Sequence, residues 1–270
     1  MNKSIIRAFV ATALAAVLTL PIACAQQAQS TPKQSDTVPP SPSSTATMAA
    51  GAYDFPVKGG TDAWRALGSH DAMIAACQVP DSLLAGMPTD ALVETILNYP
   101  LYGDIFAHNS VQEGFDAVAA GFNGLQELLT RSDAGTILLK VYEDVDPAAV
   151  EEEWSLPEKG QYAFKLYYVE ITIAQTHILR DLDGGQMKEL VSEALRKNEA
   201  TMGFADIYGR MSQECAGLVV ARALQQAQYP DFLALSQADT SVQHFLRTGS
   251  FPMGTTLESI LGLGQRSVAK

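Results

Sequence analysis

The chain has 270 residues and a formal net charge of −12, with 30 acidic and 18 basic side chains. This acidic balance repels nucleic-acid phosphates and anionic lipids, so we expect no nucleic-acid partner and no membrane contact except through an N-terminal lipid. Three cysteines are too few for a fold that depends on a disulfide framework.

The first 25 residues have the pattern of a bacterial export signal. Lys3 and Arg7 precede an apolar run from Ala8 to Leu20, and Ala23-Cys24-Ala25 supplies small residues for cleavage. The apolar run has about 13 residues, fewer than the roughly 20 that a membrane-spanning helix needs. We therefore expect an exported protein that works in the periplasm or outside the cell.

Two processing routes fit this start. Simple cleavage would release a soluble chain, whereas Leu20-Pro21-Ile22-Ala23-Cys24 resembles a lipobox in which Cys24 is acylated, with Pro21 departing from the usual aliphatic residue. Residues 26–52 are rich in Gln, Ser, Thr and Pro and nearly lack large apolar residues, so they are predicted to be a disordered linker. A tethered lipoprotein and a freely exported protein both remain open.

Residues 53–270 are predicted to form a single all-helical domain. The clearest helix spans Val111–Leu129, where apolar residues recur three or four positions apart. Capping boxes are predicted at Ser110 with Glu113, Ser155 with Glu158, and Thr255 with Glu258. The predicted helices span residues 62–67, 70–78, 80–87, 90–99, 103–108, 111–130, 133–143, 147–154, 157–181, 186–199, 210–228, 230–236, 241–247 and 256–264.

Two local features bear on the fold class. Asp183-Gly184-Gly185 is typical of a helix end. Tyr162–Ile173 alternates in a way that also fits a strand, but its capped start and its apolar continuation favour a buried helix. The prediction is an irregular multi-helix bundle, with a short helix-pair solenoid as the alternative; the lack of a fixed repeat period favours the bundle.

Three segments, Cys77–Pro80, Met87–Pro100 and Phe122–Leu129, resemble a group of uncharacterised exported bacterial proteins. The resemblance extends loosely over Trp64–Leu246. It implies a helical exported domain and supplies no activity, cofactor or site residue.

The sequence has no motif for a phosphate-binding loop, a zinc protease, a serine-hydrolase elbow or a redox dithiol. Asp181-Leu182-Asp183-Gly184 begins like a calcium loop, but its later positions lack the ligands, so a helix end is expected there. The acidic residues of 143–153 are expected to form a solvated helix junction. We therefore predict no cofactor and no metal.

One spacing suggests acid–base chemistry. His108 follows Asp104 by four residues, so an α-helix would place both on one face, and Glu113 approaches from the next helix. Asp104, His108 and Glu113 are therefore the candidate catalytic or metal-binding residues of a hydrolase. The alternative is that His108 has a structural role.

Three further histidines were considered. His177 follows Glu170 by seven residues, which is two turns along one face of a helix. A structural histidine is the alternative there, and His70 and His244 are expected to be structural or exposed.

The turn between two predicted helices is a candidate patch for a ligand or partner. It holds Asn98, Tyr99, Tyr102 and Asp104, and His108 follows. The alternative is that its aromatic rings anchor the turn in the core.

Cys77 and Cys215 each lie on an apolar helical face. They form either one disulfide or two buried free thiols.

These observations favour a non-enzymatic helical domain in the cell envelope or outside the cell. It would bind an envelope or extracellular protein, or a small ligand. The alternative function is an envelope hydrolase that uses the Asp104–His108 pair.

Overall fold

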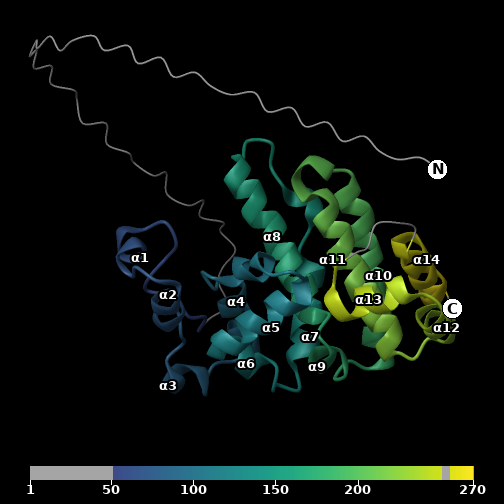
Figure 1. Ribbon diagram of the computed structural model, residues 1–270, viewed down its shortest axis with the longest axis horizontal. Coiled ribbons are helices and arrows are strands. Elements are labelled where there is room, and N and C mark those ends of the chain that lie inside the picture. Colours follow the sequence, from purple (N-terminus) through teal and green to yellow (C-terminus); the bar gives the residue numbers. More distant parts are fainter. Residues whose placement is uncertain (1–50, 251–255, 270) are drawn as a thin grey trace, which may run out of the picture. The chain divides into compact units, whose positions relative to one another are not determined.

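The computed structural model describes residues 51–250 and 256–269, and every regular element in these ranges is a helix (Figure 1). The all-α prediction is confirmed. Residues 1–25, most of the predicted linker, Cys24 and Thr255 lie outside the described residues. The elements are α1 (Asp62–Ala66), α2 (His70–Ala76), α3 (Asp81–Leu84), α4 (Thr89–Leu97), η1 (Tyr102–Ala107), α5 (Val111–Gly121), α6 (Asn123–Leu128), α7 (Ala134–Asp144), η2 (Pro147–Ala149), α8 (Leu156–Ile173), α9 (Thr176–Leu179), α10 (Gly184–Met202), α11 (Ala205–Gln226), α12 (Pro230–Ala238), α13 (Thr240–Thr248) and α14 (Thr256–Val268).

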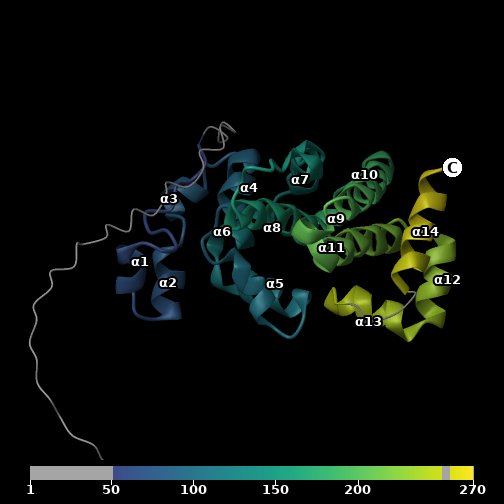
Figure 2. The same cartoon turned by 90° about the horizontal axis from the view of Figure 1, so that it is seen from above.

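Helix α11 is enclosed by other helices. It contacts α8, α9, α10, α12, α13 and α14, and Figures 1 and 2 both show α10 and α11 side by side. Every residue from Cys215 to Leu224 is buried, which is the pattern of a helix covered on all sides. A solenoid repeat contacts only its neighbours in the stack, so the arrangement is the irregular bundle that the sequence predicts. Among the described helices, none combines the length and apolar character that a membrane crossing requires.

The helix predicted over residues 111–130 is divided in two. The backbone leaves the helical region at Phe122 (φ −125°, ψ 114°), which ends α5 and precedes α6. The Phe122 ring is fully buried and stacks on Tyr99 with 3.9 Å between ring centroids. The apolar periodicity is therefore real, but it belongs to two helices.

Asn123 and Gln78 stabilise this break with reciprocal hydrogen bonds. Val79 N–H donates to Asn123 Oδ1 at 3.0 Å, and Asn123 Nδ2 donates to Val79 O at 2.7 Å. Asn123 N–H donates to Gln78 Oε1 at 3.1 Å, and Gln78 Nε2 donates to Gly121 O at 3.0 Å. Gln78 thus pairs two backbone groups that a continuous helix would have paired internally, and Asn123 ties the break to the segment that contains Val79.

The helix predicted over residues 157–181 also divides. Tyr162–Ile173 lies within α8, so the helical interpretation of that segment is confirmed. Gln175 has extended backbone (φ −72°, ψ 137°) and precedes α9. Its side chain donates to Ile171 O at 2.8 Å, while Arg222 donates to Ala174 O at 3.3 Å. Side chains again satisfy the carbonyls at the end of a helix.

Three other predicted boundaries are corrected. Asp183 begins α10 and does not end a helix: its Oδ1 accepts from Gln186 N–H at 2.9 Å, and Gln186 Oε1 accepts from Asp183 N–H at 3.1 Å. The helix predicted over 147–154 is reduced to η2. Helix α11 begins before residue 210, with a kink at Gly209 (φ 55°, ψ −154°), a backbone conformation that favours glycine.

A buried polar cluster joins α7, α8 and α10. Tyr142 OH donates to Glu170 Oε1 at 2.7 Å, and Glu170 Oε2 has no hydrogen-bond partner in the described chain. Lys197 Nζ lies 4.9 Å from the centre of the Tyr142 ring, donates to Val145 O and pairs with Glu193 at 2.8 Å. Burial raises the pKa of Glu170 to about 8, although the Tyr142 hydrogen bond and the Lys197 charge oppose this. The folded protein therefore holds Glu170 protonated at neutral pH.

Replacing Glu170 is expected to change how stability depends on pH. The unfolded chain releases this proton near the ordinary pKa of 4.5, whereas the folded chain retains it up to about pH 8. The contribution of the protonated Glu170 to the unfolding free energy is therefore fully present below pH 4.5 and is lost as the pH rises toward 8. Relative to Glu170→Gln, the wild type should lose on the order of 3–5 kcal/mol of unfolding free energy across this window.

Chemical denaturation at several pH values measures how steeply the unfolding free energy of each variant changes with pH. The same substitution at the exposed Glu153 is the control and should leave the slope unchanged. Parallel curves for the wild type and Glu170→Gln would contradict a protonated buried carboxyl group.

Asn123→Ala tests the helix break between α5 and α6. It removes both side-chain hydrogen bonds to Val79, so the unfolding free energy should fall by about 2–3 kcal/mol. Asn98→Ala removes exposed hydrogen bonds to Glu94 at the end of α4 and should cost about 0.5 kcal/mol. Equal losses in urea denaturation of the two variants would be inconsistent with a structural role for Asn123.

Candidate functional site

In the described chain, no hydrogen bond or ion pair joins the residues predicted to act in catalysis, Asp104, His108 and Glu113. The predicted helix 103–108 is the 3-10 helix η1, and His108 follows it with extended backbone (φ −107°, ψ 171°). A 3-10 helix has three residues per turn, so positions four apart do not share a face. Asp104 Oδ2 lies instead 2.7 Å from Nε2 of His70, at the start of α2. The predicted pairing with His108 is thus replaced by a pairing with His70.

Glu113 lies in the first turn of α5 and forms no hydrogen bond with Asp104. Ser110 Oγ accepts from Glu113 N–H at 3.1 Å, but the Glu113 carboxylate accepts from Asn109 Nδ2 at 3.2 Å. Half of the predicted capping box is therefore present. Helix α5 packs closely on η1 because Gly114 lacks a side chain: a Cβ there would lie 1.9 Å from Ile105 O.

The predicted binding patch is divided between the surface and the core. Asn98 is exposed and donates to Glu94. Tyr99 stacks on Phe122, and the Tyr102 hydroxyl bonds with Thr172 Oγ1. Both tyrosines are buried, and burial raises the pKa of each hydroxyl. The alternative expectation, that this turn anchors aromatic rings in the core, holds.

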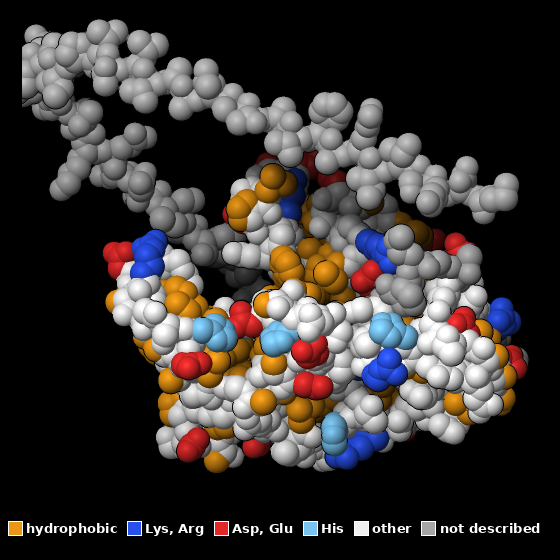
Figure 3. Space-filling view, viewed as in Figure 1, with side chains coloured by type: hydrophobic (Ala, Val, Ile, Leu, Met, Phe, Trp, Pro, Cys, Tyr) orange, Lys and Arg blue, Asp and Glu red, His pale blue; other side chains and the backbone are white. Residues whose placement is uncertain are grey.

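The remaining histidines and acidic residues do not form a cluster. His177 is exposed on α9 whereas Glu170 is buried, so their predicted shared face is wrong. In the described residues, no group of three or more His, Cys, Asp and Glu side chains is placed to hold a metal ion. Burial and a hydrogen bond with Glu189 raise the pKa of Glu143. Figure 3 shows two histidine side chains near each other on one face, with an acidic side chain between them, and the other histidines farther away.

Cys77 and Cys215 are buried free cysteines, so the disulfide alternative is not realised. Burial raises the pKa of both thiols. Because the thiolate is the reactive form, both side chains are expected to be inert in the folded protein.

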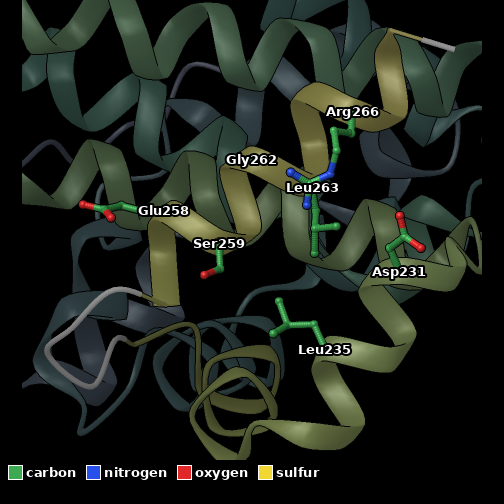
Figure 4. Close-up of a pocket in the computed structure, with 7 residues that line it drawn as sticks. All are labelled: Asp231, Leu235, Glu258, Ser259, Gly262, Leu263 and Arg266. Carbon is green, nitrogen blue, oxygen red and sulfur yellow. The ribbon is translucent and has the colours of Figure 1, made fainter.

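One groove lies between α12 and α14 and has a volume of about 470 Å³ (Figure 4). Figure 4 shows Glu258 pointing away from the space that Leu235 and Ser259 face, with Asp231 and Arg266 toward the other end. Its charged side chains do not converge on one point. This groove therefore has little that could fix the orientation of a ligand.

A second groove, of about 480 Å³, is bordered by α5, α9, α11 and α13. We name it the Arg222 groove. Its apolar lining comes from Phe115, Ala119, Leu129 and Leu246, and its polar lining includes Gln112, Asp116, Gln175, His177, Arg222 and Arg247. It combines a hydrocarbon surface with charged groups of both signs.

Arg222 is the buried charge of this groove, with 8% of the residue exposed. Its Nε and one terminal nitrogen donate to Leu246 O at 3.2 and 2.9 Å, and the other terminal nitrogen donates to Ala174 O at 3.3 Å. A guanidinium has five N–H groups, so one remains on each terminal nitrogen. Within the described chain, no carboxylate lies at ion-pair distance from Arg222. Burial lowers its pKa to about 10, against the charge of Asp116, so it remains cationic at neutral pH.

Two glutamines position the acidic residue of the groove. Gln112 Nε2 donates to Asp116 Oδ1 at 2.8 Å and lies 3.0 Å from Gln175 Oε1. Gln175 in turn donates to Ile171 O, as described above. Neutral groups therefore hold Asp116, and its carboxylate forms no ion pair within the described residues.

Apart from His177, sequence reasoning missed the polar residues of this groove. A signal existed for Arg222, which is the one charged residue in the run Cys215–Leu224. A charge on a buried helix needs a partner, so this position could have been singled out. Gln112 and Asp116 gave no such signal, because polar residues four apart are ordinary on an exposed helix face.

The state of the two thiols can be checked by alkylation and mass spectrometry. Iodoacetamide should leave Cys77 and Cys215 unmodified in the native protein, because both are buried and un-ionised. In denaturant, both should be alkylated without any reductant. Alkylation that requires prior reduction would show a disulfide and contradict the structure.

Comparison of the chain with protein-family models, with curated proteins and with solved structures found no match.

Proposed function

We propose that this chain is an exported helical domain that binds a small ligand through an anionic group, in the Arg222 groove. The observation that carries the proposal is the buried Arg222 guanidinium, which has no carboxylate at ion-pair distance in the described chain. Three hydrogen bonds to the carbonyls of Leu246 and Ala174 satisfy part of the guanidinium, but a buried charge without a counter-ion is still costly in free energy. An anion in the groove supplies the partner.

The groove's size and lining favour an organic carboxylate. Its volume of about 480 Å³ lies within the range of small-molecule sites. The two free N–H groups of Arg222, one on each terminal nitrogen, suit the two oxygens of a carboxylate. Phe115, Leu129 and Leu246 offer a surface for a hydrocarbon tail. A bare inorganic anion would leave this apolar surface without a contact.

The N-terminal sequence supports the exported location. The cationic start, the short apolar run and the small residues near Cys24 are those of an export signal. Either simple cleavage or acylation of Cys24 places the domain beyond the cytoplasm, where it would capture a small molecule. An envelope or extracellular protein would then be a recipient of that molecule.

The hydrolase alternative now centres on the His70–Asp104 pair. These two side chains are 59% and 34% exposed, and neither lines the Arg222 groove. They are not placed to act on a ligand bound at Arg222. Ligand binding is therefore the function that the geometry favours.

A titration with 4-methylpentanoate tests the proposal. This carboxylate has an apolar tail, and at about 100 times its Kd it should add roughly 2.7 kcal/mol of stability, which raises the Tm of a domain this size by about 5–10 °C. Proton NMR should also show the ring resonances of His177 shifting, because His177 lines the groove. The ring resonances of His70, which pairs with Asp104, should not shift.

Arg222→Gln should abolish the rise in Tm that 4-methylpentanoate causes. The Tm of each variant with ligand is compared with its own Tm without ligand. The exposed Arg210→Gln is the matched control and should respond like the wild type. Equal rises in the wild type and Arg222→Gln, or an unchanged His177 signal, would reject the groove as the binding site.

A further inference from the structure

Building on the proposed function, we infer that the ligand is a zwitterion of the α-amino-acid type with an aliphatic side chain. Its carboxylate binds Arg222, its ammonium group binds Asp116, and its side chain lies against the apolar lining of the groove. The inference rests on three features of the Arg222 groove.

The first feature is a pair of opposite charges that share the groove without forming an ion pair. Arg222 and Asp116 both line it, and the Asp116 charge acts on the Arg222 guanidinium. Their charged atoms are nevertheless more than 4.0 Å apart, since no ion pair joins them. A ligand that carries both signs on neighbouring atoms can bridge them.

The second feature is the way each charge is held in place. Backbone carbonyls of Leu246 and Ala174 fix the guanidinium, and the Gln112 amide fixes Asp116 Oδ1. Asp116 is an exposed residue of the groove lining, and only its Oδ1 accepts a hydrogen bond from the described chain, so an ammonium group, which has only donors, can bind at Oδ2. Both charges are therefore positioned by neutral partners and remain available to a ligand.

The third feature is the electrostatic repulsion that a ligand with only one charged group would meet in the groove. A plain carboxylate at Arg222 would lie near the Asp116 carboxylate, and like charges repel. A plain amine at Asp116 would lie near the Arg222 cation and meet the same repulsion. Only a ligand with both groups places an attractive partner at each charge.

Three probes with nearly the same carbon skeleton separate these cases. L-Leucine carries both charges, 4-methylpentanoate lacks the amino group, and 3-methylbutylamine lacks the carboxylate. Isothermal titration calorimetry on the purified protein should show that leucine binds about tenfold more tightly than 4-methylpentanoate, and that 3-methylbutylamine binds no tighter than the carboxylate.

Asp116→Asn keeps the shape of the side chain and an oxygen that can accept from Gln112, but it removes the charge. It should weaken leucine binding about tenfold and leave 4-methylpentanoate binding unchanged or slightly tighter. Asp206→Asn, at an exposed aspartate in the first turn of α11, is the matched control and should bind all three probes like the wild type.

The outcomes distinguish this inference from the proposed function. If leucine and 4-methylpentanoate bind equally, and Asp116→Asn affects neither, the zwitterion inference is overturned while anion binding at Arg222 stands. If neither probe binds, both proposals are overturned. Tighter leucine binding that Asp116→Asn does not weaken would also overturn the assigned role of Asp116.

Discussion

The guanidinium of Arg222 connects three parts of the chain that are far apart in sequence. It projects from the enclosed helix α11, donates to Leu246 O near the end of α13, and donates to Ala174 O where α8 gives way to α9. Each carbonyl would otherwise need another donor at a helix end. The same side chain therefore satisfies the backbone at two junctions and provides the charge of the groove, so the site and the packing of these helices depend on one residue.

At other helix breaks in the chain, too, side chains form hydrogen bonds with the backbone groups that the helix end leaves unpaired. At Phe122 the Gln78 side chain pairs backbone groups that the helix leaves open, and the Asn123 side chain bonds in turn with the Val79 backbone. At Gln175 the side chain bonds back to Ile171 O. A break in a long amphipathic pattern is stable where a side chain replaces the missing backbone partner. In this chain those side chains are amides and a guanidinium, which present several donors at once.

The limits of sequence reasoning follow from this rule. The spacing of Phe115, Phe122 and Leu125 predicted their burial correctly, because periodicity is a local property. It did not predict the break at Phe122, because Gln78 belongs to a distant segment that only the fold brings near. Gln112, Asp116 and Gln175 of the Arg222 groove were missed for the same reason, because only the fold brings them beside Arg222. Asp104 was paired with His108 because an α-helix was assumed there. The segment is the 3-10 helix η1, and Asp104 pairs with His70 instead.

The net charge of the whole chain also bears on which ligand the groove can select. A surface of net charge −12 repels free anions over a distance comparable with the Debye length, about 8 Å at physiological ionic strength, so a simple carboxylate approaches against this field. A zwitterion has no net charge and meets no such barrier, yet at contact it still offers Arg222 a carboxylate. The acidic exterior therefore disfavours singly charged anions at a distance. At contact, Arg222 and Asp116 together bind a molecule whose two charges match those of the groove.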